Sequence, residues 1–171
     1  MRKKNPVLLM ILLVVLVACG NTRPVLQEIT EENTANQSTN DISYIFMHRS
    51  VCFGQCPDYM LELYKNGLVR YTGRNFVEPV GIYEKKFPQS TIQNIFDAFH
   101  AKRVDTTRET YERIIADLPG LSYRIEYGSR EKKIYNAHFG PEFLKELATM
   151  IDSTIRIDKS WTKISDGPKG D

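Results

Sequence analysis

The sequence predicts an α+β domain, with one antiparallel sheet of about five strands and two helices packed on one of its faces. Three observations lead to this prediction. Apolar and polar residues alternate in several short runs, as in strands that bury one face. An Asn-Gly pair at 66–67 separates two of these runs and indicates a tight hairpin. Two later segments carry apolar residues at helical spacing instead.

The runs that predict strands fall into two groups. The first group precedes the first helix and covers residues 44–47, 59–64, 68–72 and 80–87. The second group is a hairpin formed by residues 121–127 and 134–138. Residues 130–133 are all charged, so we expect them at the solvated tip of that hairpin.

Each predicted helix begins at a recognisable residue. In the first, Ser90 and Gln93 have the spacing of a capping box, and the buried stripe is Ile92, Ile95, Phe96 and Phe99. The second begins at Pro141, where the missing N–H of a proline costs nothing, and its stripe is Leu144, Leu147, Ala148, Ile151 and Ile155. Between them, residues 103–118 predict only one helical turn near 111–116. Trp161 is expected to pack against the domain.

The first eighteen residues have the features of a bacterial signal peptide. Three basic residues at 2–4 precede an uninterrupted apolar run of twelve residues, 7–18. A helix needs ~20 residues to cross a bilayer, so this run predicts a cleaved leader rather than a membrane span. It ends in Leu16-Val17-Ala18-Cys19, which resembles the lipobox of bacterial lipoproteins. The resemblance implies that Cys19 becomes the first mature residue and carries diacylglycerol and an N-linked acyl chain such as palmitate.

The chain is therefore expected to have four parts: a signal peptide at 1–18, a lipidated flexible tether at 19–41, a single domain at 42–160 and a frayed tail at 161–171. The tether is rich in Asn, Thr, Glu and Ser and cannot bury enough surface to offset its ordering entropy. Two or three acyl chains hold a protein on a membrane. These features predict a protein of the bacterial cell envelope, with the outer membrane as the default location.

Composition and motifs exclude several function classes. The formal net charge of +2 falls to −1 when the three basic residues of the leader are removed, and no basic stripe remains to bind nucleic acid. The chain contains no G-x-S-x-G, H-E-x-x-H, P-loop or G-x-G-x-x-G motif. Its histidines, His48, His100 and His138, are widely separated. We therefore expect no cofactor and no metal, and favour a protein that is not an enzyme.

Cys52 and Cys56 are open to three chemistries: a structural disulfide, a redox pair or half of a zinc site. Lipidation of Cys19 would leave them as an even pair in an oxidising compartment, which favours the disulfide. Redox pairs are usually C-x-x-C with the first cysteine at a helix N-terminus, whereas this spacing is one residue longer and Pro57 leads into a predicted strand. Zinc needs two further ligands, and the sequence has no second Cys/His pair.

The cysteines belong to a longer pattern, Arg49-x-x-Cys52-Phe53-Gly54-x-Cys56-Pro57-x-Tyr59. It is followed by Asn66-Gly67, Tyr71-x-Gly73, Gly81-x-Tyr83 and Asp117-x-Pro119. Together these residues resemble a bacterial family of domains of unknown function, across roughly residues 44–155. The resemblance implies a short secreted or lipid-anchored protein and assigns no catalytic residue.

A loop closed by Cys52 and Cys56 would present Arg49, Phe53, Gln55 and Asp58 as a binding surface at one end of the sheet. The alternative is that Phe53 packs inward and Arg49 pairs with a nearby carboxylate such as Asp58 or Asp117. The sequence therefore predicts a lipid-anchored envelope protein that is a non-catalytic binding or structural module, with an envelope protein or a glycan as partner. The other hypothesis is an envelope thiol-disulfide oxidoreductase that uses Cys52 and Cys56.

Overall fold

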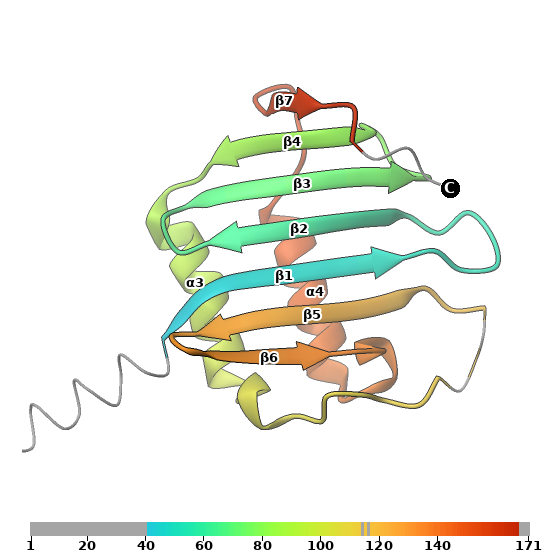
Figure 1. Cartoon of the computed structure of the whole chain (residues 1–171), viewed down its shortest axis with the longest axis vertical. Helices are drawn as coiled ribbons and strands as arrows, with labels where there is room; N and C mark the ends of the chain where they lie inside the picture. Colours follow the sequence, from blue (N-terminus) through green and yellow to red (C-terminus); the bar gives the residue numbers. More distant parts are fainter. Residues whose placement is uncertain (1–40, 114, 116, 168–171) are drawn as a thin grey trace, which may run out of the picture. The chain divides into compact units, whose positions relative to one another are not determined.

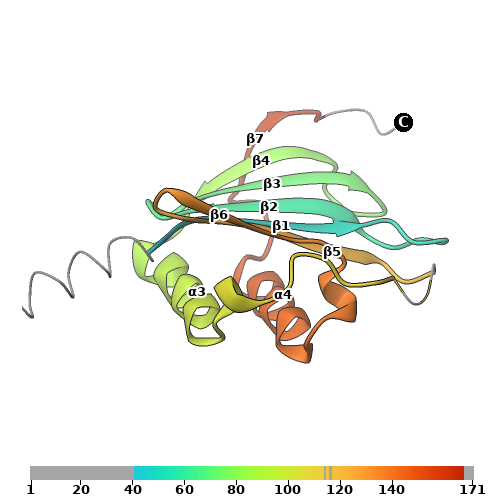
Figure 2. The same cartoon turned by 60° about the horizontal axis from the view of Figure 1, so that its bottom comes forward.

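The computed structural model describes residues 41–113, 115 and 117–167. The predicted signal peptide, Cys19 and all of the tether before residue 41 lie outside the described residues. Within them, one open sheet has seven antiparallel strands in the order β6-β5-β1-β2-β3-β4-β7. Two α-helices cover one face of the sheet and leave the other face open (Figures 1 and 2).

The bounds of these elements follow the chain. The strands are β1 (Ile42–Ser50), β2 (Asp58–Tyr64), β3 (Leu68–Asn75), β4 (Gly81–Lys86), β5 (Gly120–Tyr127), β6 (Arg130–Ile134) and β7 (Thr162–Ser165). The helices are α3 (Gln89–Ala101) and α4 (Glu142–Thr154), with two short 3-10 helices, η1 (Val104–Thr106) and η2 (Ala137–Phe139). No helix in this part of the chain is long and apolar enough to span a membrane.

The predicted fold class is confirmed, but the prediction of about five strands is wrong because the sheet has seven in the described residues. Residues 130–133, expected at a hairpin tip, form most of β6. The segment expected to fray contains β7, which pairs with β4. Both are edge strands, and the side chains of β7 and most of those of β6 are exposed. Edge strands of this kind carry charged residues and lack the alternation that indicates a strand.

The core lies between the helices and the covered face of the sheet. Alternate residues of the central strands point toward the helices, such as Ile45 and Met47 of β1 and Leu61 and Leu63 of β2, all 2% exposed or less. The predicted helical stripes are confirmed: α3 buries Ile92, Ile95, Phe96 and Phe99, and α4 buries Leu144, Leu147, Ala148 and Ile151. Burial of these stripes fixes the helices on one face of the sheet.

The predicted capping box does not form. The N-cap of helix α3 is Pro88, two residues before Ser90, and no side chain caps the helix. Gln93 instead donates a hydrogen bond to Asp97 (2.8 Å). The prediction of a helical turn near 111–116 is also wrong for the residues described there. The helical turn that follows α3 is η1, at Val104–Thr106.

The end of the chain packs as predicted at Trp161. Its side chain is 7% exposed and lies edge-to-face on Phe87, with the ring centroids 5.7 Å apart. The indole N–H donates to the carbonyl oxygen of Arg156 (3.0 Å). This contact holds the segment that leads into β7 against the sheet.

The open face is covered by its own polar and aromatic side chains. Tyr44 is 5% exposed although no helix lies over it. Its hydroxyl donates to Glu62 (2.9 Å) and accepts from Arg124 (2.9 Å). The Arg124 guanidinium also lies over the rings of Tyr44 and Phe46, 5.2 and 5.4 Å from their centroids. Cation–π contacts and hydrogen bonds together cover the central strands on this side.

Candidate functional site

Two loops lie together at one end of the sheet. Residues 51–57 join β1 to β2, and residues 76–80 join β3 to β4. Because these four neighbouring strands alternate in direction, both loops emerge at the same end, at the right in Figure 1. We call these two loops the loop end. Strand β1 begins at the opposite end of the sheet.

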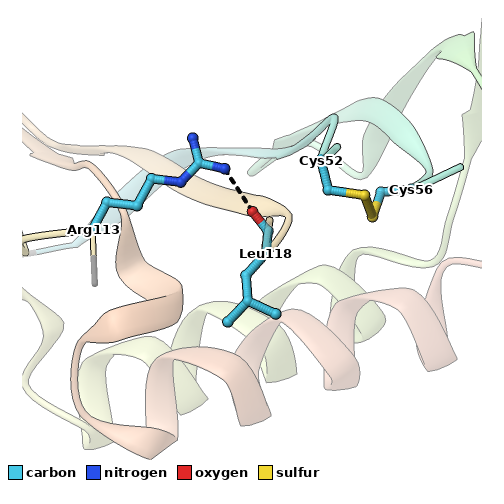
Figure 3. The surroundings of a disulfide bond; sticks show 4 residues. All are labelled: Cys52, Cys56, Arg113 and Leu118. Atoms are coloured by element: carbon cyan, nitrogen blue, oxygen red, sulfur yellow. Dashed lines mark hydrogen bonds between the residues drawn. A yellow bond between two sulfur atoms is a disulfide. The ribbon is translucent and has the colours of Figure 1, made fainter. Parts of the chain in front are cut away.

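A disulfide joins Cys52 and Cys56 across the first loop, with their Cα atoms 5.5 Å apart. Four residues of straight strand would span about 13 Å, so the loop turns back on itself between the cysteines. Figure 3 shows the bridge together with Arg113, which donates a hydrogen bond to the Leu118 carbonyl oxygen (2.8 Å) in the segment leading to β5. The connection between β1 and β2 that carries both cysteines contains no helix. The helix dipole that lowers the pKa of a catalytic thiol is therefore missing from this loop.

Arg49 and Tyr59 lie at the base of the stapled loop and both bind Asp152 of α4. They are directly opposite each other in the β1–β2 register. Arg49 donates to Oδ2 of Asp152 from Nε (2.9 Å) and Nη2 (2.6 Å), and the Tyr59 hydroxyl donates to Oδ1 (2.6 Å). The first and last residues of the cysteine pattern therefore hold one carboxylate on the helix-covered side.

Burial and charge act together in this cluster. Burial alone would lower the pKa of Arg49, but the adjacent Asp152 carboxylate outweighs it and raises that pKa above its usual value. Burial also raises the pKa of Tyr59, and its hydrogen bond to Asp152 raises it further. Arg49 therefore stays charged and Tyr59 stays protonated, so both remain donors to the carboxylate. Hydrogen bonds to a charged acceptor are stronger than those between neutral groups.

Asp58 lies on the opposite, open face and is only 3% exposed. One of its oxygens is 3.0 Å from His48 Nε2, and the other accepts from the side-chain amide of Asn75 (3.1 Å). Arg74 Nε lies 3.6 Å from the same second oxygen. Three polar partners therefore satisfy this buried carboxylate, as buried charges require.

The four residues predicted to form one surface are divided between three places. Arg49 binds α4, and Asp58 is enclosed on the open face. Of the four, only Phe53 and Gln55 are exposed, and Phe53 is 93% exposed. The alternative in which Phe53 packs inward is therefore wrong. Arg49 does pair with a carboxylate, but its partner is Asp152 and neither Asp58 nor Asp117, the two partners suggested by the sequence.

Sequence reasoning missed the apolar side chains that accompany Phe53 at the loop end. Val51, Phe76 and Val80 are 45%, 55% and 51% exposed. Phe76 also has a φ of 53°, a left-handed backbone conformation that is an outlier for a bulky side chain and costs about 1–3 kcal/mol. The apolar run Phe76-Val77 lies close to Pro79, which is typical of a loop. The local pattern alone, however, fits an exposed loop as well as the start of a strand.

Asp152 was also missed. It follows Ile151 at the edge of the buried stripe of α4, and a carboxylate at that position is a weak signal of a partner on the sheet. Nowhere in the described residues do three or more His, Cys, Asp or Glu side chains lie together so that they could bind a metal ion.

The described fold and loop define a class: a small α+β domain with a disulfide-closed loop at one end of an open antiparallel sheet. The family described as Domain of unknown function (DUF6438) matches residues 43–155, more than half of the chain, and the protein belongs to this family. The match runs from β1 past the end of α4 and leaves out Trp161 and β7. A comparison with curated proteins finds no match.

We predict different costs for removing two neighbouring tyrosine hydroxyls. Tyr59→Phe deletes a hydrogen bond to a charged carboxylate, so the free energy of unfolding should fall by about 2 kcal/mol. Tyr71→Phe is the matched control, because the Tyr71 hydroxyl has no hydrogen-bond partner among the described residues. Its change should stay within about 0.5 kcal/mol. Urea denaturation of the two variants measures both values, and equal losses would show that Asp152 gains nothing from Tyr59.

Proposed function

We propose that this protein is a lipid-anchored, non-catalytic binding module of the bacterial cell envelope, and that its loop end binds another envelope protein. One observation carries the proposal. Phe53 is 93% exposed at the tip of a loop that is closed by a disulfide. An aromatic side chain held in this position loses little conformational entropy when a partner buries it. Aromatic residues are also over-represented among the residues that dominate binding energies.

The loop is fixed at its base as well as across its middle. Arg49 and Tyr59 tie the two strands that carry it to α4, and the disulfide closes the segment between them. The tip is therefore presented by a rigid support. Rigid presentation of a binding loop lowers the ordering cost of association.

The chemistry of the loop end favours a protein partner over a glycan. Val51 and Val80 are exposed aliphatic side chains, and Phe76 adds a second exposed ring. Aliphatic surface gains free energy mainly by being removed from water against other apolar surface. The strained backbone at Phe76 supports the same interpretation, since strain of this kind is concentrated at functional sites.

The anchor completes the proposal. It rests on the basic and apolar leader and on Leu16-Val17-Ala18-Cys19. A tether from Cys19 would enter the domain at Asp41, just before β1, and β1 begins at the end of the sheet opposite to the loop end. Attachment at that end leaves the loop end accessible to a partner.

Replacing Phe53 tests the binding surface. Phe53→Ala should reduce crosslinked recovery of the partner protein from intact cells at least tenfold, because the aromatic anchor is removed while an exposed side chain contributes little to folding. Tyr135→Ala is the matched control, since Tyr135 is an aromatic residue that is 51% exposed outside the loop end. Recovery of the same partner at an unchanged level from Phe53→Ala, or of glycan alone, would contradict the proposal.

Replacing Cys19 tests the anchor. Without the thiol no lipid can be attached, so Cys19→Ala should leave the protein unprocessed or release it from the membrane fraction. Immunoblots of separated membrane and soluble fractions measure this, with metabolic labelling by palmitate as a second readout. A Cys19→Ala protein that is cleaved to mature size and still fractionates with membranes would show that the anchor is not a lipid on Cys19.

A further inference from the structure

A pocket of about 420 Å³ lies between the sheet and the C-terminal end of α4, and the proposed function does not use it. Leu61 and Tyr71 line it from the sheet, Glu78 from the β3–β4 loop, and Asp152, Ile155 and Arg156 from α4 and the residues after it. Pockets that bind small molecules measure roughly 300–1,000 Å³. This pocket therefore has the size of a site for a small ligand.

Tyr71 lines this pocket with a hydroxyl that no described residue binds. It is 4% exposed. Its ring packs against those of Tyr59 and Trp161, at 5.8 and 6.5 Å between centroids. Its hydroxyl, however, has no hydrogen-bond partner among the described residues. The buried side-chain polar atoms without a partner among the described residues belong to Arg74, Arg124 and Tyr127. The Tyr71 hydroxyl is therefore reachable from the pocket, where a water or a ligand can pair with it.

The position of the Tyr71 ring depends on the absence of a side chain at Gly73. A side-chain carbon added at Gly73 would lie 2.7 Å from this oxygen and 2.3 Å from the carbonyl oxygen of Pro79. Only a glycine at position 73 leaves room for the ring to lie as it does. Burial raises the pKa of Tyr71 to about 12, so the hydroxyl is protonated at neutral pH and can donate a hydrogen bond.

Two charges of opposite sign flank the pocket without pairing with each other. Glu78 is exposed and forms no ion pair within the described residues. Arg156 is exposed and donates from Nε to the Ser153 carbonyl oxygen (3.2 Å), and it has no carboxylate partner in the same part of the chain. Asp152 differs, because Arg49 neutralises it. The charges available to a ligand are therefore one carboxylate and one guanidinium.

Four aliphatic side chains line the pocket, together with Tyr59 and the paired Asp152. Leu61 and Ile155 are 2% and 3% exposed, and Val77 and Ile157 line the same space. An aliphatic group placed there would be removed from water at little cost, because no unpaired charge lies beneath it. The lining therefore suits a ligand with an apolar body and with opposite charges at its two ends.

We propose that this pocket binds a short aliphatic peptide with free ends, whose ammonium group pairs with Glu78 and whose carboxylate pairs with Arg156. Its aliphatic side chains lie against Leu61 and Ile155, and Tyr71 donates a hydrogen bond to one of its carbonyl oxygens. Leucyl-leucine has these features and serves as the probe. This site shares the β3–β4 loop with the loop end through Val77 and Glu78, but it does not require that Phe53 bind a protein.

Calorimetric titration of the purified full chain with leucyl-leucine tests the proposal. Leucyl-leucine should bind at least tenfold more tightly than its acetylated and amidated form, which lacks both charges. Arg156→Gln should weaken leucyl-leucine at least fivefold and leave the affinity for leucyl-leucine amide unchanged. Glu78→Gln should weaken leucyl-leucine similarly and leave acetyl-leucyl-leucine unchanged. Glu146→Gln, an exposed charge of α4 that does not line the pocket, is the control and should bind as wild type.

Tyr71→Phe separates a binding role from a structural one. It should weaken leucyl-leucine at least threefold while the thermal unfolding midpoint stays unchanged. Methyl NMR signals of Leu61 and Ile155 should shift on titration, which places the ligand in this pocket. No binding at millimolar leucyl-leucine, equal binding of the uncharged form, or binding that leaves these methyl signals unmoved would each overturn the proposal.

Discussion

The Asp152 carboxylate is the contact on which the stapled loop depends. It accepts hydrogen bonds from Arg49 of β1 and Tyr59 of β2. Arg49 lies three residues before Cys52, and Tyr59 lies three residues after Cys56. A single residue of α4 therefore fixes both strands at the point where the loop leaves the sheet. Arg49 and Asp152 are partly screened from water, with side chains 25% and 30% exposed. Their attraction is therefore stronger than that of a fully exposed ion pair.

This arrangement separates the residues that hold the loop from those that can meet a partner. Arg49 and Tyr59 face the helices, Asp58 is enclosed on the open face by His48 and Asn75, and the disulfide closes the segment between. Phe53 is then free of any structural task. The pocket beneath the β3–β4 loop shares Asp152 and Tyr59 with the base of the stapled loop. Both proposed sites are thus built around the same carboxylate.

The sequence predicts what depends on local spacing. The central strands are predicted by alternation, as at Tyr59, Leu61 and Leu63, and α3 is predicted by the apolar stripe that ends at Phe99. Both patterns arise because these residues bury one face of their element. The edge strands β6 and β7 were misplaced or missed, since their exposed side chains need no alternation. The partner of Arg49 lies 103 residues away, and no local pattern identifies a contact made by folding. The sequence could not decide the exposure of Phe53 for the same reason. Whether a loop residue packs inward depends on neighbours that are distant in the chain.

A double-mutant cycle between Arg49 and Asp152 tests this account most directly. Urea denaturation of the wild type, Arg49→Gln, Asp152→Asn and the double variant gives the coupling free energy between the two side chains. Because the pair is partly buried and the carboxylate accepts two hydrogen bonds from Arg49, the account predicts a coupling of at least about 1.5 kcal/mol. A coupling below about 0.5 kcal/mol, the value of an ordinary exposed ion pair, would contradict it.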